Sequence, residues 1–322
     1  MLSRVADSIY WMSRSIERAE NVARFVDVTL NLMLDLPEAT VDQWRPIVDT
    51  SGDFQLFRQL GYDATEDNVV RFLTFDERNP NSILSCLQAA RENARSVRSV
   101  ISSEMWEQLN TFYLMVKEAA AAPGHLDHHS FFSRVKLASH LFVGVTDATM
   151  SHGEAWHFNR LGRLQERADK TSRILDVKYF LLLPSPNYVG TALDDVQWSA
   201  LLKSASALEM YRKRYGRIAP GDIAEFLILD REFPRAIRFC LFRCEESLRG
   251  ISGSLPGTYS NTPERKLGRL RSELDCTTIE EIIGAGLHEF LDRFQADLNA
   301  VGDSIFEAFF AMRPMSQTAI QQ

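Results

Sequence analysis

Two stretches of the chain carry the same order of charged side chains. The first reads Glu17-Arg18-Ala19-Glu20, and the second, 149 positions later, reads Glu166-Arg167-Ala168-Asp169. Arginine presents a planar fork of N–H donors that suits a carboxylate or a phosphate, and a neighbouring glutamate can hold that fork in one rotamer. The repeated pair therefore indicates anion recognition, and Glu17 and Glu166 are the candidates for a general base.

Helical spacing brings the side chains around each pair onto one strip. On the first helix the charged and amide residues follow one another in steps of three and four, so they converge on one face. The second stretch repeats this spacing, and a third helix carries a related Arg-Glu-Asn sequence. The candidate ligand-binding residues are Arg14, Arg18, Asn21, Arg163, Arg167 and Asp169, with Arg91, Glu92 and Asn93 from the third helix.

An alternative interpretation is a solvated helix face, on which each ion pair contributes only about 0.2–0.5 kcal/mol. Aromatic side chains argue against it, because Tyr10, Trp11 and Trp156 lie on or beside the charged strips. A fully hydrated face seldom carries so much apolar area. We therefore predict that the strips are partly covered and that carboxylates bind Arg18 and Arg167.

Two further arginines, Arg235 and Arg238, follow a helix start expected at Pro234. The helix dipole does not favour cations at this end of a helix. One interpretation is anion binding together with the free backbone N–H groups. The other is exposure to solvent, and the sequence favours exposure.

Metal and cofactor signatures are weak. A single Glu-x-x-His unit, Glu154 to His157, lacks the second unit and the two further glutamates of a di-iron bundle. The loop sequence Asp127-His128-His129 has no partner at ligand spacing. A Gly-rich phosphate loop, a Gly-x-Ser-x-Gly elbow and a Cys-x-x-Cys pair are all missing. We therefore expect neither a metal site nor a cofactor.

The composition is that of a soluble globular protein of 322 residues, 45% hydrophobic and 25% charged. A net charge of −7 gives no reason to expect nucleic-acid binding. No signal peptide and no apolar run long enough for a membrane span are visible. Four scattered cysteines without an export signal predict a cytoplasmic protein with reduced thiols, and Cys240 and Cys244 are expected to pack as small apolar residues.

Apolar residues recur with a period of 3.6, and alternating strand patterns are missing. This predicts an all-α multi-helix bundle in which residues 1–322 form a single domain. The repeated Glu-Arg motif predicts an internal duplication with halves at residues 1–150 and 151–322. Individual helices are expected over residues 81–101, 194–215, 234–252 and 279–312, with an internal break over residues 184–190.

Several motifs occur together in this chain, although each alone is weakly specific. They are Tyr10-Trp11, Glu17 to Asn21, Ala90 to Arg95, Trp106 with Asn110, Leu161 to Asp169, and Glu225 to Arg235. In this combination the chain resembles the alpha-E family, bacterial all-helical proteins named for a Glu-Arg motif, over essentially its whole length. Two positions depart from the family pattern. Ala236 stands where a serine is expected, and Gln165 stands where an apolar residue is expected.

The resemblance implies a role in amide-bond chemistry. Such proteins are typically encoded with, or fused to, a circularly permuted ATP-grasp-like ligase, and a transglutaminase-like cysteine peptidase often accompanies them. The expected function is a helical partner or accessory module that binds the ligase and a peptide or amino-acid carboxylate. One alternative is an amide-forming or aminoacyl-transferring enzyme, with Glu17 or Glu166 as base and Arg18 or Arg167 on an acyl phosphate. Another is a structural scaffold.

Overall fold

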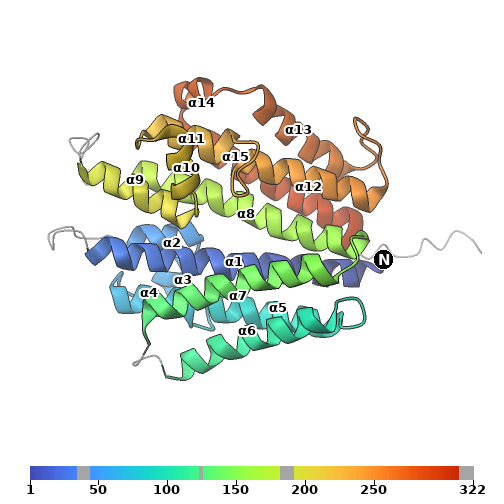
Figure 1. Ribbon diagram of the computed structural model, residues 1–322, viewed down its shortest axis with the longest axis horizontal. Helices are drawn as coiled ribbons and strands as arrows, with labels where there is room; N and C mark the ends of the chain where they lie inside the picture. The colour runs from blue at the N-terminus through green and yellow to red at the C-terminus, as the bar shows by residue number, and fades with distance from the viewer. Residues whose placement is uncertain (35–43, 123–125, 182–191, 312–322) are drawn as a thin grey trace, which may run out of the picture.

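The computed structural model describes residues 1–34, 44–122, 126–181 and 192–311. Over these ranges the chain forms fifteen α-helices, a short π-helical segment and no strand (Figure 1). The all-α prediction is therefore confirmed. None of the helices in the described ranges is both long enough and apolar enough to cross a membrane.

The helices differ widely in length, from 6 residues in α3 to 32 residues in α1. Their bounds are α1 Ser3–Leu34, α2 Arg45–Ser51, α3 Phe54–Gln59, α4 Glu66–Thr74, α5 Ile83–Ser96, α6 Ser103–Ala121, α7 His128–Thr149, α8 Glu154–Leu181, α9 Ala192–Ser204, α10 Leu208–Tyr215, α11 Pro220–Leu229, α12 Ile237–Ser252, α13 Thr262–Cys276, α14 Ile279–Ala285 and α15 Leu287–Ile305, followed by the π-helical segment η3 Phe306–Phe310. The two longest, α1 and α8, contain the two Glu-Arg motifs.

These two long helices lie side by side across the middle of the molecule (Figure 1). Each is covered by its own set of partners in matching order. Helix α1 packs against α5 and α7, and α6 lies against both of those; α8 packs against α12 and α15, and α13 lies against both of those. Contacts across the middle are reciprocal as well, since α2 packs on α8 and α9 packs on α1. The packing around the first central helix is thus repeated around the second.

A second sequence repeat, at a spacing of 154 residues, runs through the turns that lead into α5 and α12 and into the helices on either side. Its identical positions are Phe72, Leu73, Asp76, Pro80, Ile83, Cys86 and Leu87 in the first copy, and Phe226, Leu227, Asp230, Pro234, Ile237, Cys240 and Leu241 in the second. Both aspartates hold the turn by accepting backbone N–H groups: Asp76 accepts that of Arg78 at 3.0 Å, and Asp230 that of Phe233 at 2.6 Å. The same local chemistry therefore sets both turns.

Three predicted helices differ from the structure for local reasons. The helix expected over 279–312 is broken at Gly286, whose φ of +98° a continuous helix cannot adopt. The helix expected over 194–215 is broken at Ser206, which has a φ of +51°. Pro234 does not start a helix but lies in the turn before α12, which begins at Ile237. The break expected over 184–190 lies outside the described residues.

Close approach of the two central helices depends on Gly162 of α8. A Cβ atom at this position would clash with the backbone oxygen of Tyr10 and would lie 2.6 Å from Ser13 Oγ, both on α1. Such a contact with backbone cannot be relieved by turning a side chain. Glycine is therefore required here for helix packing, while its backbone conformation is ordinary.

We predict that Gly162→Ala lowers the free energy of unfolding by about 1–3 kcal/mol, because it overpacks the α1–α8 interface. Gly144→Ala is the matched control. Gly144 is an exposed residue of α7, and nothing lies within 4 Å of the added Cβ. Alanine should therefore stabilise that helix by up to about 1 kcal/mol. Urea unfolding of the two variants measures the difference. Equal effects of the two substitutions would contradict the close-packed interface.

Candidate functional site

The two Glu-Arg motifs exchange partners across the α1–α8 interface. Arg167 donates from Nε to Glu17 Oε1 at 2.7 Å and from Nη2 to Oε2 at 2.8 Å. Arg18 donates from Nε to Glu166 Oε1 at 2.6 Å and from Nη2 to Oε2 at 3.0 Å. Each motif thus supplies the carboxylate that binds the other motif's arginine in a two-pronged pair. The prediction that Arg18 and Arg167 are covered and paired is confirmed, since their side chains are 21% and 13% exposed.

Glu166 is surrounded by further cations and has no contact with solvent. Arg14 Nε donates to its Oε2 at 2.9 Å, and Lys170 Nζ lies 3.7 Å from its Oε1. Burial alone would raise the pKa of this carboxyl, but Arg18 and Arg14 together hold the pKa well below its usual range. A carboxylate so strongly held in its ionised form is a poor acceptor for a proton.

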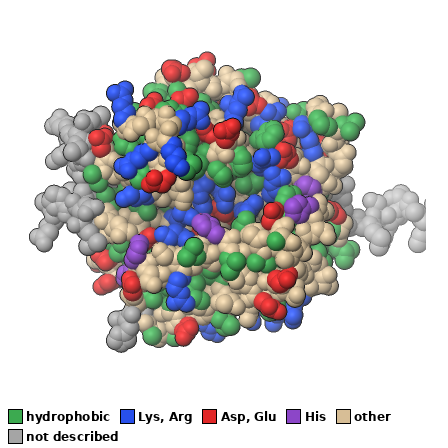
Figure 2. Space-filling model, viewed as in Figure 1, with side chains coloured by type: hydrophobic (Ala, Val, Ile, Leu, Met, Phe, Trp, Pro, Cys, Tyr) green, Lys and Arg blue, Asp and Glu red, His purple; other side chains and the backbone are tan. Residues whose placement is uncertain are grey.

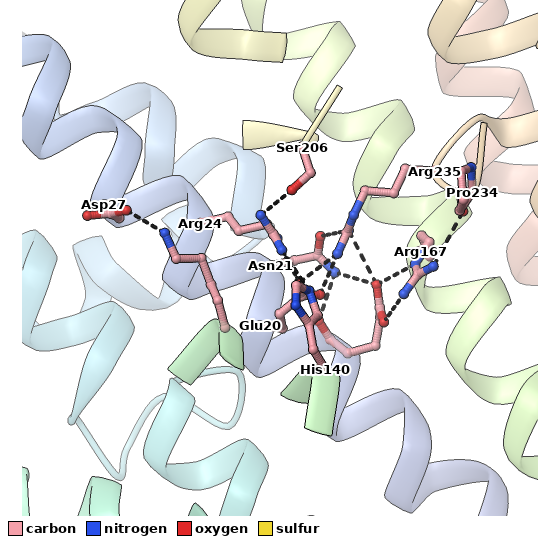
Figure 3. Close-up of polar contacts among 11 residues, drawn as sticks. Glu20, Asn21, Arg24, Asp27, His140, Arg167, Ser206, Pro234 and Arg235 are labelled. Atoms are coloured by element: carbon pink, nitrogen blue, oxygen red, sulfur yellow. Dashed lines mark hydrogen bonds and ion pairs between the residues drawn. The ribbon is translucent and has the colours of Figure 1, made fainter. Parts of the chain in front are cut away.

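Arg235, in the turn before α12, also joins this network, although the sequence favours its exposure to solvent. Instead it is 6% exposed and lies between residues of α1 (Figure 3). Its Nη2 donates to both oxygens of Glu20 at 2.6 Å, and its Nη1 donates to Asn21 Oδ1 at 3.0 Å. Because Pro234 belongs to a turn and not to a helix, Arg235 can direct its side chain inward to these groups. The prediction of exposure is therefore wrong for Arg235.

Glu20 connects this network to α7. Arg24 Nε donates to Glu20 Oε1 at 2.7 Å, and His140 Nε2 lies 3.1 Å from the same oxygen. Arg235 and Arg24 outweigh the effect of burial and hold the pKa of Glu20 well below its usual range. Arg24 also donates to the hydroxyl of Ser206, the residue whose positive φ breaks the α9–α10 segment (Figure 3). The polar network therefore extends to α7 and to the turn between α9 and α10.

Charge pairs at the far end of the two helices repeat as well. Asp27 of α1 and Asp176 of α8 occupy equivalent positions of the sequence repeat. Asp27 Oδ1 lies 3.0 Å from His129 Nδ1 of α7, and Asp176 Oδ1 lies 2.7 Å from His288 Nδ1 of α15. Helices α7 and α15 are thus each attached to a central helix through a histidine and an aspartate.

The structure does not bring all the predicted ligand-binding residues together. Those on α1 and α8, namely Arg14, Arg18, Asn21, Arg163, Arg167 and Asp169, lie along the interface of the two helices. Arg91 belongs to a separate group on the outer side of α5. Its Nε donates to Asn110 Oδ1 at 2.7 Å, and its guanidinium lies over the Trp106 and Tyr113 rings. Glu92 pairs there with Arg91 and Arg95, and the backbone oxygen of Asn93 accepts from Ser96.

Two residues of the network were missed in the sequence. Asn81 Oδ1 accepts from Arg18 Nη1 at 2.5 Å, at the position of the second repeat where the other copy has Arg235. His140 was overlooked because a lone histidine on an amphipathic helix carries no pattern. The Asn81–Arg235 correspondence was detectable, because both residues follow a proline that is part of the repeat.

Metal ligation finds no support in the described ranges, where no group of three or more histidine, cysteine or acidic side chains could hold an ion. Glu154 and His157 thus do not form part of such a group. Cys86, Cys240 and Cys244 are buried free thiols, as expected for the latter two. Burial raises the pKa of both Cys86 and Cys240 to about 12, so these thiols are unreactive.

Fold and charge exchange together define an all-helical protein whose two central helices are joined by paired Glu-Arg motifs. The model of the Alpha-E family, described as a predicted alpha-helical domain with a conserved ER motif, matches residues 1–310. The chain therefore belongs to the Alpha-E family.

The chain is also similar to uncharacterized proteins of Mycobacterium bovis and of two Mycobacterium tuberculosis strains. Each is 23% identical over 331 aligned residues, which cover 93% of this chain. The chain spans only 36% of the length of these relatives. No solved structure matches it.

We predict that Arg167→Ala lowers the free energy of unfolding by about 3–5 kcal/mol, because Glu17 would remain buried without its two-pronged partner. Arg18→Ala should cost less, about 1.5–3 kcal/mol, since Glu166 keeps Arg14 and Lys170. Arg95→Ala, which removes an exposed pair, should change stability by less than about 0.5 kcal/mol. Urea denaturation tests this order, and a harmless Arg167→Ala would show that the exchange does not hold the helices together.

Acid should weaken the fold through the same carboxylates. The folded-state pKa of Glu166 is lowered, so its stabilisation is fully present above the unfolded value of about 4.3 and is lost as the pH falls below it. Glu166→Gln should therefore flatten the dependence of unfolding free energy on pH between about pH 5 and 2. Thermal melts of the two proteins over this range measure the slope. Parallel curves would show that Glu166 does not contribute to acid sensitivity.

Proposed function

We propose that this chain is a helical, non-catalytic module of an ATP-grasp-type peptide or amide ligase system, which binds the ligase and a peptide or amino-acid carboxylate. The observation that carries the proposal is that both candidate bases are used up in the α1–α8 exchange. Membership of the Alpha-E family supports the ligase association through what the resemblance implies. The mycobacterial relatives are nearly three times as long as the aligned chain, which fits a module that works with other domains.

The enzyme alternative requires a base that reaches the substrate and can accept its proton. Glu17 and Glu166 are 1% and 0% exposed, and each already accepts two hydrogen bonds from an arginine fork. Glu166 also has its pKa held well below the usual range by Arg18 and Arg14. These properties suit a structural clamp, so the geometry favours a binding module over an enzyme.

Helix α7 offers a surface on which the ligase can dock. Leu137 and Leu141 are four residues apart on this helix, and their exposures are 66% and 54%. Apolar side chains that stand together on an otherwise polar face favour a protein partner. Leu255, 72% exposed in the loop after α12, provides a matched control at a distance from α7 along the chain.

We expect the full chain to co-purify with a neighbouring ATP-grasp ligase and to hydrolyse no ATP by itself. ATP turnover by the ligase with a peptide acceptor should increase when the chain is added, and a transglutaminase-like peptidase is the second partner to try. Leu137→Asp with Leu141→Asp should abolish co-purification without changing the melting temperature, whereas Leu255→Asp should not. Amide-bond formation by the chain alone, lost in Glu17→Gln, would instead establish the enzyme alternative.

A further inference from the structure

A cleft of about 520 Å³ opens between α8, the end of α7 and the start of α12. Figure 2 shows Lys and Arg side chains gathered in a hollow across the middle of this face of the molecule. The cleft contains four arginines and two aromatic rings. Its lining residues are Asp147, His152, Trp156, Arg160, Arg163, Leu164, Arg167, Pro234, Phe239 and Arg243.

Three of the four arginines have carboxylate partners. Arg167 is bound by Glu17 in the central exchange. Arg160 and Arg243 share a single acid, Glu246, whose Oε2 lies 2.9 Å and 3.0 Å from them. Rings position both side chains, since Arg160 lies over Trp156 and Arg243 lies over Phe239. The walls of the cleft thus hold two guanidinium groups in place around one carboxylate.

Arg163 differs from the other three because it forms no hydrogen bond or ion pair within the described residues. Its Nε is shielded from solvent and has no partner. Burial, followed by the nearby charge of Arg167, lowers the pKa of Arg163 to about 10. A partly buried cation without an acid partner is unfavourable for folding. This position therefore reduces stability in the free protein.

The sequence repeat allows Arg163 to be compared with its equivalent in α1, which has an acid partner. Arg14, the equivalent of Arg163 in α1, is bound by Glu166 at 2.8 Å. The corresponding acid for Arg163 would be Glu17, but Glu17 pairs with Arg167 and, at its Oε1, lies 3.4 Å from Arg235. The other copy has the uncharged Asn81 in place of Arg235. The two acids thus have different sets of cations, and Arg163 faces the cleft without an ion-pair partner.

We infer that this cleft is an oxyanion-binding site that takes a phosphate-type group, with the fork of Arg163 as its main donor and Arg160 and Arg243 beside it. An unpaired guanidinium fork binds two oxygens of one anion. Phosphate is favoured over carboxylate because its several oxygens can meet donors from different sides. The inference does not depend on the proposed ligase association.

The experiment compares Arg163→Met with Arg14→Met and Arg95→Met in the full chain. Without ligand, Arg163→Met should leave the melting temperature unchanged or raise it, because the variant removes a partly buried, unpaired charge. Arg14→Met should lower it, because Glu166 loses a partner. Inorganic phosphate and adenosine monophosphate should raise the melting temperature of the wild type and of Arg95→Met. In Arg163→Met, calorimetry should show phosphate binding weakened by at least about tenfold.

Two results would overturn the inference. One is an unchanged phosphate response in Arg163→Met together with destabilisation as large as in Arg14→Met, which would make Arg163 a structural residue. The other is stabilisation by glutamate-containing peptides but not by phosphate, which would assign the cleft to carboxylates. Comparison of phosphate with adenosine monophosphate distinguishes a free phosphate site from a nucleotide site. All these measurements use the chain alone, so a failed ligase co-purification leaves their outcome unaffected.

Discussion

The exchange between Glu17–Arg167 and Arg18–Glu166 is the interaction on which the rest of the structure depends. Central helices of a large bundle are usually apolar on all sides, because unpaired charges are costly to bury. Here the charged faces of α1 and α8 are buried against each other, and the forks of Arg18 and Arg167 each meet an acid at short distance. The apolar faces of both helices are then free to hold the covering layers. Polar pairing and apolar packing therefore divide the surface of each central helix between them.

Much of this arrangement was predictable from the sequence. The Glu-Arg repeat indicated two equivalent helices, and the aromatic residues beside them indicated that the charges are covered; both expectations agree with the pairing of Arg18 and Arg167. Helix breaks were harder to predict. Gly286 and Ser206 adopt positive φ values, although the apolar periodicity around them continues without interruption. Periodicity reports which face is buried and gives little information on where a helix ends.

The position of Arg235 could not be predicted because a side chain's direction depends on whether its residue lies in a helix or in a turn. A three-residue shift of the helix start, from Pro234 to Ile237, turned an expected surface arginine into a buried one. The partner of each charge was also hidden, since pairing occurs between helices about 150 residues apart. A charge repeat identifies which residues take part, but it does not identify which carboxylate each arginine binds.

Two-fold reciprocity between α1 and α8 is the contact pattern of an isologous dimer, made here within a single chain. It has a consequence for the order of events during synthesis. When α1 leaves the ribosome, Glu17 and Arg18 have no partners, because residues 166 and 167 are not yet made. The first half can bury its apolar faces early, but it must keep one charged face in water until α8 arrives. Final closure of the core is therefore a late, long-range step, of the kind that slows folding. Until that step, the nascent chain exposes a surface that only its own second half matches.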